Sequence, residues 1–345
     1  MTLDLNTFLT IVYCMVDTLY QSEFASARPS RPGPRPHLHD SEVLTLMLVA
    51  QYHPSRSERK VGRYAAKHWR SYFPHLLSQS QFNRRARDLH GVFARLAPLL
   101  AEQVIATLNL DAPYEMLDGV PVPLMARCRG NRHRCFATAA SIGCGGSDRE
   151  WYDGMQLLLT ATPCGLITGF TLGPGGTEER WVADALLRWR AQPSAAAPTL
   201  AELRPIVRTD HVSRPAVGPT GPLGPATGAG TPHGRPLLGD LGFTGVGWIQ
   251  HWSRDYGTAV LTKADYAGLP LEERKRAGSW LSGVRQVVET VNTWLVERFG
   301  LKRPRARSYW GVLTRVAAKV AAFNLGVYLN HLFARPTFAF FDPFE

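Results

Sequence analysis

Residues 154–172 read GMQLLLTATPCGLITGFTL, and this stretch decides the fold class. Two apolar runs flank ATPCG at 161–165, where Pro and Gly are typical of a tight turn. The stretch therefore predicts a β-hairpin of two buried strands. Two further runs of β-type residues, YEMLDGVPVPL from Tyr114 and RCFATAASIGCG from Arg134, predict strands just before the hairpin.

Helical patterns precede this strand region. Asp40 and Ser41 can cap SEVLTLMLVAQYH, SERKVGRYAAKHWR follows from Ser57, and Ser78 can cap SQSQFNRRARDLHGVFARLAPLLAEQVIATL. These segments predict an all-helical N-terminal domain over residues 1–110.

The chain alternates between helices and strands after the hairpin. TEERWVADALLRWRA at 177–191 predicts a helix, RPLLGD at 235–240 a buried strand, GFTGVGWIQHWSRD a helix and YGTAVLTKA another strand. The predicted class is therefore α/β, with a second domain over residues 111–335. The chain ends in the aromatic segment FARPTFAFFDPFE. We expect its last part, a tail at 336–345, to dock on the core or on a partner.

A Gly- and Pro-rich stretch interrupts the second domain. PAVGPTGPLGPATGAGTPHGRP at 215–236 has six Gly and six Pro in 22 positions. Such a composition cannot bury enough apolar surface to fold. We therefore predict a disordered surface insertion at about 192–236.

The composition favours an anionic partner. The 345 residues carry a net charge of +11 and the pI is about 9.7. Nucleic acid is favoured over an acidic membrane surface, because no basic amphipathic anchor is present. The charge is concentrated: residues 51–100 contain ten Lys or Arg against two acids, and residues 298–319 contain seven against none.

Cysteine usage and apolar segments favour a cytoplasmic protein. None of the five cysteines forms a CxxC pair, so scattered reduced thiols are favoured over a zinc site. The N-terminal apolar stretch lacks the positive region of a signal peptide. Residues 314–334 contain Arg315, Lys319, Asn324 and Asn330, which a bilayer-spanning helix would tolerate badly. We expect both stretches to be core helices.

The first basic region offers a candidate DNA-binding element. A short helix, a turn and a second helix that begins SQFNRRAR are similar to a helix-turn-helix, in which Arg84, Arg85 and Arg87 could contact DNA. The alternative is a solvated basic helix face that has no partner.

Three acids are candidates for a site. Asp118 and Asp240 each follow a short apolar strand, and Glu289 lies in a helix, VRQVVETVNTWL at 284–295, away from the stripe of Val284, Val288, Val291 and Leu295. Carboxylate oxygens without Cys or His suit a hard cation such as Mg²⁺ or Mn²⁺. Alternatively, the two Asp residues cap turns, and Glu289 forms a solvated helix pair with Arg285.

The whole set resembles a known family over roughly residues 78 to 333. The segments that carry the likeness are SQSQFNRRAR, LDGVPVPLMARCR, REWYDGMQLLLTATPCGLITGFTLGPGG, LLGDLGF, the R-x-x-x-E of Arg285 and Glu289, and RFGLKRPRARSYWGVLTRVAAKVAAFNL. Their order resembles that of the DDE transposases of bacterial insertion sequences. The resemblance implies a ribonuclease-H-like mixed sheet flanked by helices, with the acids on the first strand, the fourth strand and a late helix.

The resemblance also implies a chemistry. Asp118, Asp240 and Glu289 would be the catalytic residues and would hold two Mg²⁺ (or Mn²⁺) ions for DNA cleavage and strand transfer. The DNA-binding residues would be Arg84, Arg85, Arg87, Arg285, Arg298, Lys302, Arg303 and Arg305. The partners would be double-stranded DNA, as terminal inverted repeats and as target, and a second copy of the chain on that DNA. The protein would then be cytoplasmic and nucleoid-associated, with no membrane partner.

Three positions depart from the family pattern. Ser282 and Val296 stand where the family often has Tyr and Lys, with Arg298 the nearest substitute, and Gln156 stands where a basic residue is expected. The alternative function is therefore a catalytically inactive relic, or a repressor, that still binds DNA.

Overall fold

The structure is a computed structural model that describes residues 4–26, 36–55, 57–125, 136, 139–145, 150–191 and 235–344. The insertion predicted at about 192–236 lies outside the described residues, apart from Arg235 and Pro236 at its end.

Among the described residues before 110, every element is a helix, as predicted. These helices are α1 (Leu5–Glu23), α2 (Asp40–Tyr52), α3 (Glu58–His68), α4 (Gln79–Asp88) and α5 (His90–Thr107). The helix starts follow local chemistry. The Asp4 carboxylate accepts hydrogen bonds from the backbone of Asn6 and Thr7, and Ser78 and Gln81 form a capping box at the start of α4.

The second half of the chain contains a mixed sheet of six strands. They are β1 (Glu115–Met125), β2 (Ser141–Gly145), β3 (Glu150–Ala161), β4 (Ile167–Pro174), β5 (Leu237–Leu238) and β6 (Val260–Leu261). The predicted hairpin is β3–β4, and Gly165 takes the positive φ of +79° that its turn requires.

The strand order is β2-β3-β1-β5-β6, and β4 also pairs with β3. One edge of β3 pairs with β1, and β2 and β4 share the other edge. These pairs are antiparallel, whereas β1–β5 and β5–β6 are parallel. The sheet is therefore mixed, and β1 lies at the junction between its antiparallel and parallel halves.

Helices cover both faces of the sheet. They include α7 (Glu179–Ala191), α8 (Val246–Tyr256), α9 (Leu271–Glu297) and α10 (Tyr309–Leu332), with short 3₁₀ turns η2 (Leu241–Phe243) and η3 (Lys263–Tyr266). Along β1, Met116 packs into the cluster that contains the N-terminal helices, α9 and α10, whereas Leu117 packs with α7 and α8 on the other face.

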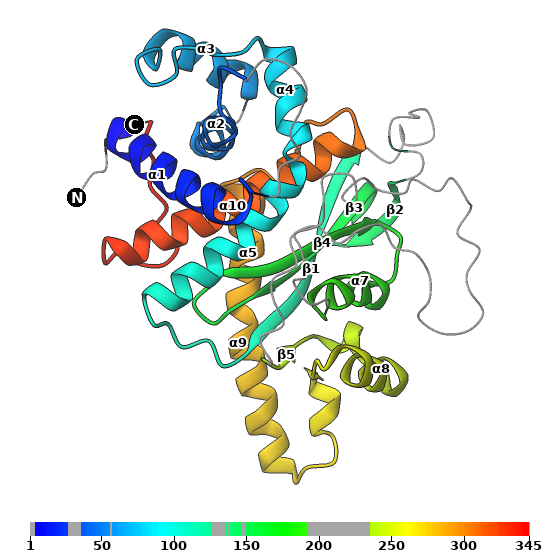
Figure 1. The fold of residues 1–345 in the computed structure, drawn as a ribbon. Coiled ribbons are helices and arrows are strands. Elements are labelled where there is room, and N and C mark those ends of the chain that lie inside the picture. Colours follow the sequence, from blue (N-terminus) through cyan, green and yellow to red (C-terminus); the bar gives the residue numbers. More distant parts are fainter. Residues whose placement is uncertain are drawn as a thin grey trace.

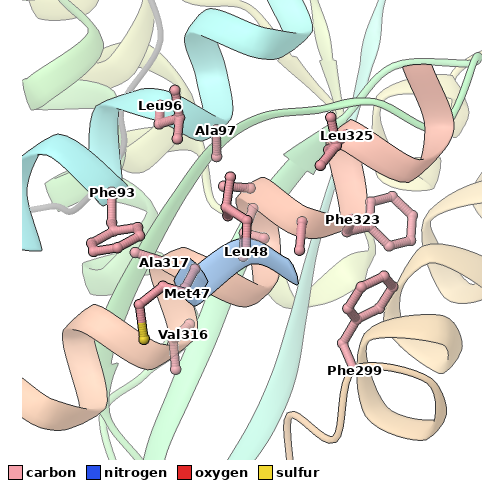
Figure 2. Packing of buried hydrophobic residues seen from close by; sticks show 14 of the residues in the cluster. Met47, Leu48, Phe93, Leu96, Ala97, Phe299, Val316, Ala317, Phe323 and Leu325 are labelled. Atoms are coloured by element: carbon pink, nitrogen blue, oxygen red, sulfur yellow. The ribbon is translucent and has the colours of Figure 1, made fainter. Parts of the chain in front are cut away.

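The larger hydrophobic core runs across the predicted boundary at residue 110. Figure 1 shows α10 between the N-terminal helices and the sheet, and α10 packs against α2, α5 and β4. Figure 2 shows part of this cluster, which brings together residues of α2, α5, the end of α9 and α10: Met47, Leu48, Phe93, Leu96, Ala97, Phe299, Val316, Ala317, Phe323 and Leu325. The helical region and the sheet therefore share one core.

Helix α10 is long and apolar enough to cross a membrane by length and composition, but 89% of its apolar window is buried inside the structure. Asn324 of this helix has hydrogen-bond partners there. Asn324 accepts a hydrogen bond from Ile167 N at 2.9 Å and donates to Ile167 O and Ala97 O, each at 2.8 Å. Asn324 therefore joins α10 to β4 and α5, as a core helix requires.

The C-terminal tail docks on its own chain. The Phe340 ring packs against Trp294, Phe299 and Phe323, and the Phe344 ring lies 5.7 Å from Tyr64 and 6.1 Å from Trp69. Of the two positions that the sequence left open for this tail, the structure places it on the core.

Candidate active site

Asp118 lies within β1, and Asp240 follows the neighbouring parallel strand β5. The prediction that Asp118 follows a short strand is wrong, because β1 continues to Met125 and Asp118 pairs there with Leu159 of β3. Met116 of β1 pairs in register with Leu238 of β5, and each acid follows two residues later along its strand direction. Parallel strands in register bring such positions to the same edge of a sheet. The pairing of β1 with β5 therefore brings together two carboxylates that are more than 100 residues apart in sequence.

Helix α9 supplies the polar residues around Asp118. The Nδ2 atom of Asn292 donates a hydrogen bond to Asp118 Oδ2 at 2.8 Å, and Nη2 of Arg285 lies 3.8 Å from Asp118 Oδ1. These two α9 residues are two turns apart, so they project from one side of the helix. That side of α9 faces the acid on β1.

Glu289 lies one turn after Arg285, and its side chain is 58% exposed. Its Oε1 atom is 3.8 Å from Arg285 Nη2, so the guanidinium lies between Glu289 and Asp118. Val288, Val291 and Leu295 are buried. The prediction that Glu289 lies away from the apolar stripe is confirmed.

Asp240 also caps a turn. Its Oδ1 atom accepts a hydrogen bond from Gly242 N at 2.7 Å at the start of η2. The capping alternative for Asp240 therefore holds, and it occupies only one of the two carboxylate oxygens. It is compatible with a second role because the carboxylate has lone pairs to spare.

A fourth acid, Glu179, joins the cluster, and the sequence reasoning missed it. Glu179 is the first residue of α7. Its Oε1 lies 3.0 Å from where a Cβ on Gly119 would stand, and its Oε2 lies 2.7 Å from the same position on Gly242. Its carboxylate therefore lies against the backbone just after Asp118 and just after Asp240. Within the described part of the chain, no hydrogen bond or ion pair holds it.

Gln156 helps to place Glu179. This buried residue of β3 donates hydrogen bonds from Nε2 to Thr177 O and to Pro174 O, in the turn that leads into α7. A neutral amide at this position thus fixes the loop before Glu179, which is a structural use for the departure from the expected basic residue.

The cluster concentrates negative charge in a partly buried place. Burial raises the pKa of Asp118 to about 6, with Arg285 opposing the shift and Asp240 adding to it. Burial raises the pKa of Glu179 to about 7, and the charges of Asp240 and Asp118 add to that shift. Both shifts mean that the ionised cluster needs a compensating positive charge or a proton.

The donor chemistry fits a divalent cation. Carboxylates of Asp118, Glu179 and Asp240 supply hard oxygens, and Asn292 adds a buried Oδ1 atom that has no hydrogen-bond partner. The side chains are not drawn together around one point: no group of three His, Cys, Asp or Glu within the described ranges is close enough to hold an ion as placed. Rotation of these side chains would have to complete a site.

The structure divides the predicted DNA-binding residues into two groups. Arg84, Arg87, Lys302, Arg303 and Arg305 are exposed. By contrast, Arg85 forms an ion pair with the buried Asp40, and Arg298 donates hydrogen bonds to Asp342 Oδ2 at 3.1 Å and to Phe341 O at 3.0 Å. Arg85 and Arg298 therefore hold the fold together.

The helix pair expected to form a helix-turn-helix has a longer connection than that motif. Residues 69–78 separate α3 from α4, whereas a helix-turn-helix uses a turn of about 3–4 residues. The helices are present as predicted, but their connection includes the buried Trp69 and Phe73, which pack into the core.

The chain matches no protein family, no curated protein sequence and no solved structure.

Proposed function

We propose that this protein is a transposase of an insertion sequence, which cleaves DNA phosphodiester bonds with divalent metal ions and transfers the freed strand to a target. The observation that carries this proposal is the convergence of Asp118, Asp240 and Glu179, from three separate elements, beside the α9 side chains of Arg285, Glu289 and Asn292. Few structural roles require so many carboxylates in one partly buried place.

The sheet supports a ribonuclease-H-like architecture for the proposed catalytic domain. Asp118 is on the first strand, and β1 has an antiparallel neighbour on one side and parallel strands on the other. Asp240 follows the fifth strand in chain order, whereas the resemblance implies the fourth. The additional strand is β2, which shares one edge of β3 with β4.

Each residue of the cluster has a role in this proposal. Two Mg²⁺ or Mn²⁺ ions would activate a water or a 3′-hydroxyl and stabilise the leaving oxygen. Asp118, Asp240 and Glu289 are the proposed ligands, and Glu179 is placed to add a fourth carboxylate. Asn292 fixes the orientation of Asp118 through its hydrogen bond, and Arg285 brings a positive charge to the position where a phosphate would approach.

The proposed partners follow from this chemistry. The substrates are the terminal inverted repeats of the element and the target DNA, and pairing two ends requires at least two copies of the chain. A protein with these substrates works in the cytoplasm, associated with the nucleoid.

A cleavage assay tests the proposal. Purified protein is incubated with supercoiled plasmid that carries the gene's own flanking DNA, with Mg²⁺, with Mn²⁺ or with a chelator. Metal-dependent nicks at the flanking ends, lost in Asp240→Ala and Glu289→Ala, are the expected result. Cleavage at those ends in the chelator, or undiminished cleavage by both variants, would contradict it.

One observation favours the alternative of a DNA-binding relic. Arg298, the nearest substitute for the missing basic residue after Glu289, is held by Asp342 and Phe341 and is not free to contact a DNA end. The relic hypothesis predicts salt-sensitive DNA binding without cleavage in either metal. The same assay, run beside a binding measurement, separates the two functions.

A further inference from the structure

Helix α3 carries a stripe of exposed cations. Arg59, Arg63 and Lys67 recur at every fourth residue, so they lie along one side of the helix, and Lys60 lies beside them. Val61 and Ala65 on the opposite side are buried. Within the described ranges, none of the four cations forms an ion pair with an acidic side chain.

The loop between α9 and α10 carries a second group of exposed cations. These residues are Lys302, Arg303, Arg305 and Arg307. This loop contains no acidic residue. Leu301 and Pro304 are buried, so the backbone is anchored while the charged side chains face outward.

Hydrogen bonds between residues that are far apart in the sequence join the two groups of cations. Arg315 of α10 donates from Nη2 to Glu58 Oε2 at 2.7 Å and from Nη1 to Arg305 O at 3.1 Å. Arg305 in turn donates to Ser55 O at 3.3 Å. The loop is therefore fastened to the N-terminal end of α3, and the one acid of α3, Glu58, is neutralised by Arg315.

Aromatic packing holds α3 in place. Tyr64 of α3 and the adjoining Trp69 pack edge-on against each other, at a centroid distance of 5.3 Å, and both contact Phe344 of the tail. A helix and a loop held in this way present their cations in a fixed arrangement, which lowers the entropy lost when a ligand binds.

We propose that Arg59, Lys60, Arg63 and Lys67, together with the 302–307 loop, form one basic surface that binds the phosphate backbone of duplex DNA. Eight exposed cations with no acid left unpaired among them complement a polyanion, and DNA offers closely spaced phosphates along a rigid rod. The choice of DNA rests on the proposed function. The main contact to the DNA backbone is thus proposed on α3. The sequence predicted it on α4, where Arg85 instead forms an ion pair with Asp40.

Binding without metal tests this surface apart from catalysis. The affinity of the full-length protein for a fluorescent DNA duplex of random sequence is measured by anisotropy over a series of salt concentrations, in chelator. One variant replaces Arg59, Arg63 and Lys67 by Gln, and a second replaces Lys302, Arg303 and Arg307 by Gln. A control variant replaces Arg274 and Arg276 by Gln at the start of α9, which lies at the other end of the molecule from α3 (Figure 1).

Each surface variant should weaken binding and make the slope of log K against log salt less negative by about 0.9 for every lost phosphate contact. The control should bind like wild type, and all variants should keep the wild-type melting temperature. Wild-type affinity in both surface variants, or an equal loss in the control, would overturn the proposal. Preferential binding of the wild type to duplex RNA or to acidic vesicles would overturn it too.

The outcome is separable from that of the proposed chemistry. If the surface variants lose DNA binding and the wild type does not cleave DNA, the basic surface is supported and the transposase proposal is contradicted. If the wild type cleaves DNA and the surface variants bind DNA as the wild type does, the transposase proposal is supported and the basic surface is contradicted.

Discussion

Gly119 and Gly242, which lie beside the two aspartates, leave room for the carboxylate of Glu179. Any Cβ at Gly242 would stand 2.7 Å from that carboxylate and 2.9 Å from Asp240 Oδ1. These distances are too short for a side chain to be accepted without movement. A side chain at Gly242 would therefore displace the carboxylates of Glu179 and Asp240, and a Cβ at Gly119 would stand 3.0 Å from Glu179 Oε1.

Glu179→Gln tests whether this carboxylate belongs to the metal site. The amide has nearly the same shape but no charge, so we expect metal affinity and metal-dependent cleavage to fall about 10- to 100-fold, while DNA binding in chelator is unchanged. The matched control is Glu178→Gln, because Glu178 is exposed and forms an ion pair with Arg180. Equal losses in both variants, measured by Mn²⁺ titration and plasmid nicking, would exclude Glu179 from the site.

The raised pKa values predict how stability depends on pH. Burial raises the pKa of Glu179 from 4.5 to about 7 in the folded protein, so the native state binds this proton more tightly than the unfolded chain does. The stability that this group contributes is therefore present below pH 4.5 and is lost as the pH rises to about 7. Asp118, whose pKa burial raises from 3.8 to about 6, acts in the same direction.

Urea unfolding of metal-free protein at a series of pH values measures this effect. Relative to Glu179→Gln, the wild type should lose on the order of 2 kcal/mol of unfolding free energy across that window, after allowance for solvent screening. Parallel pH profiles for the two proteins would show that Glu179 is not desolvated and does not interact with the two aspartates.

At the scale of elements, α10 connects the N-terminal helices to the sheet through Asn324. Replacing Asn324 by Ala leaves the buried N–H of Ile167 and the carbonyls of Ile167 and Ala97 without their partner. We expect the free energy of unfolding to fall by about 2–4 kcal/mol. Leu332→Ala on the same helix, where the side chain is exposed, should stay within about 0.5 kcal/mol. Similar losses from both variants in urea unfolding would contradict the role of Asn324.

Elements with local signals could be predicted from the sequence. The β3–β4 hairpin has its turn residues between its strands, and α4 has a capping box within its first residues. The strand pattern predicts that Asp118 and Asp240 converge but does not give the register between β1 and β5, because that register is not a local property. Glu179 was missed for the same reason. The sequence does not predict that Arg85 has a partner within the fold, because that partner, Asp40, lies 45 residues earlier in the chain.

Across the whole molecule, Glu115 connects the end of α7 to the start of β5. This fully buried acid accepts hydrogen bonds from Arg190 at 2.7 and 3.1 Å and lies 3.5 Å from Arg235 Nη1. Arg190 precedes residues 192–234, and Arg235 follows them. The chain therefore leaves and rejoins the fold at one place.

Replacing residues 192–234 by a short Gly/Ser linker should leave the fold intact. The two ends already meet at Glu115, so a shorter loop lowers the entropic cost of closure without straining α7 or β5. We expect the melting temperature to stay equal or to rise. A lower melting temperature or insoluble protein would mean that the replaced stretch contributes contacts of its own. Glu115→Gln is the counter-test, since it removes the charge that both arginines share and should lower the melting temperature.

We propose that Asp118, Asp240 and Glu289, with Glu179 beside them, hold divalent metal ions. When Fe²⁺ replaces Mg²⁺, added hydrogen peroxide oxidises the bound Fe²⁺ to Fe³⁺ and yields hydroxide and a hydroxyl radical, and ascorbate reduces the iron again. The radicals cut the polypeptide beside the bound ion, and the fragments can be identified by mass. We predict cuts near Asp118 and near Asp240 that excess Mg²⁺ suppresses and that Asp118→Asn abolishes. Cuts elsewhere in the chain, or cuts at these positions that Mg²⁺ does not suppress, would contradict the claim.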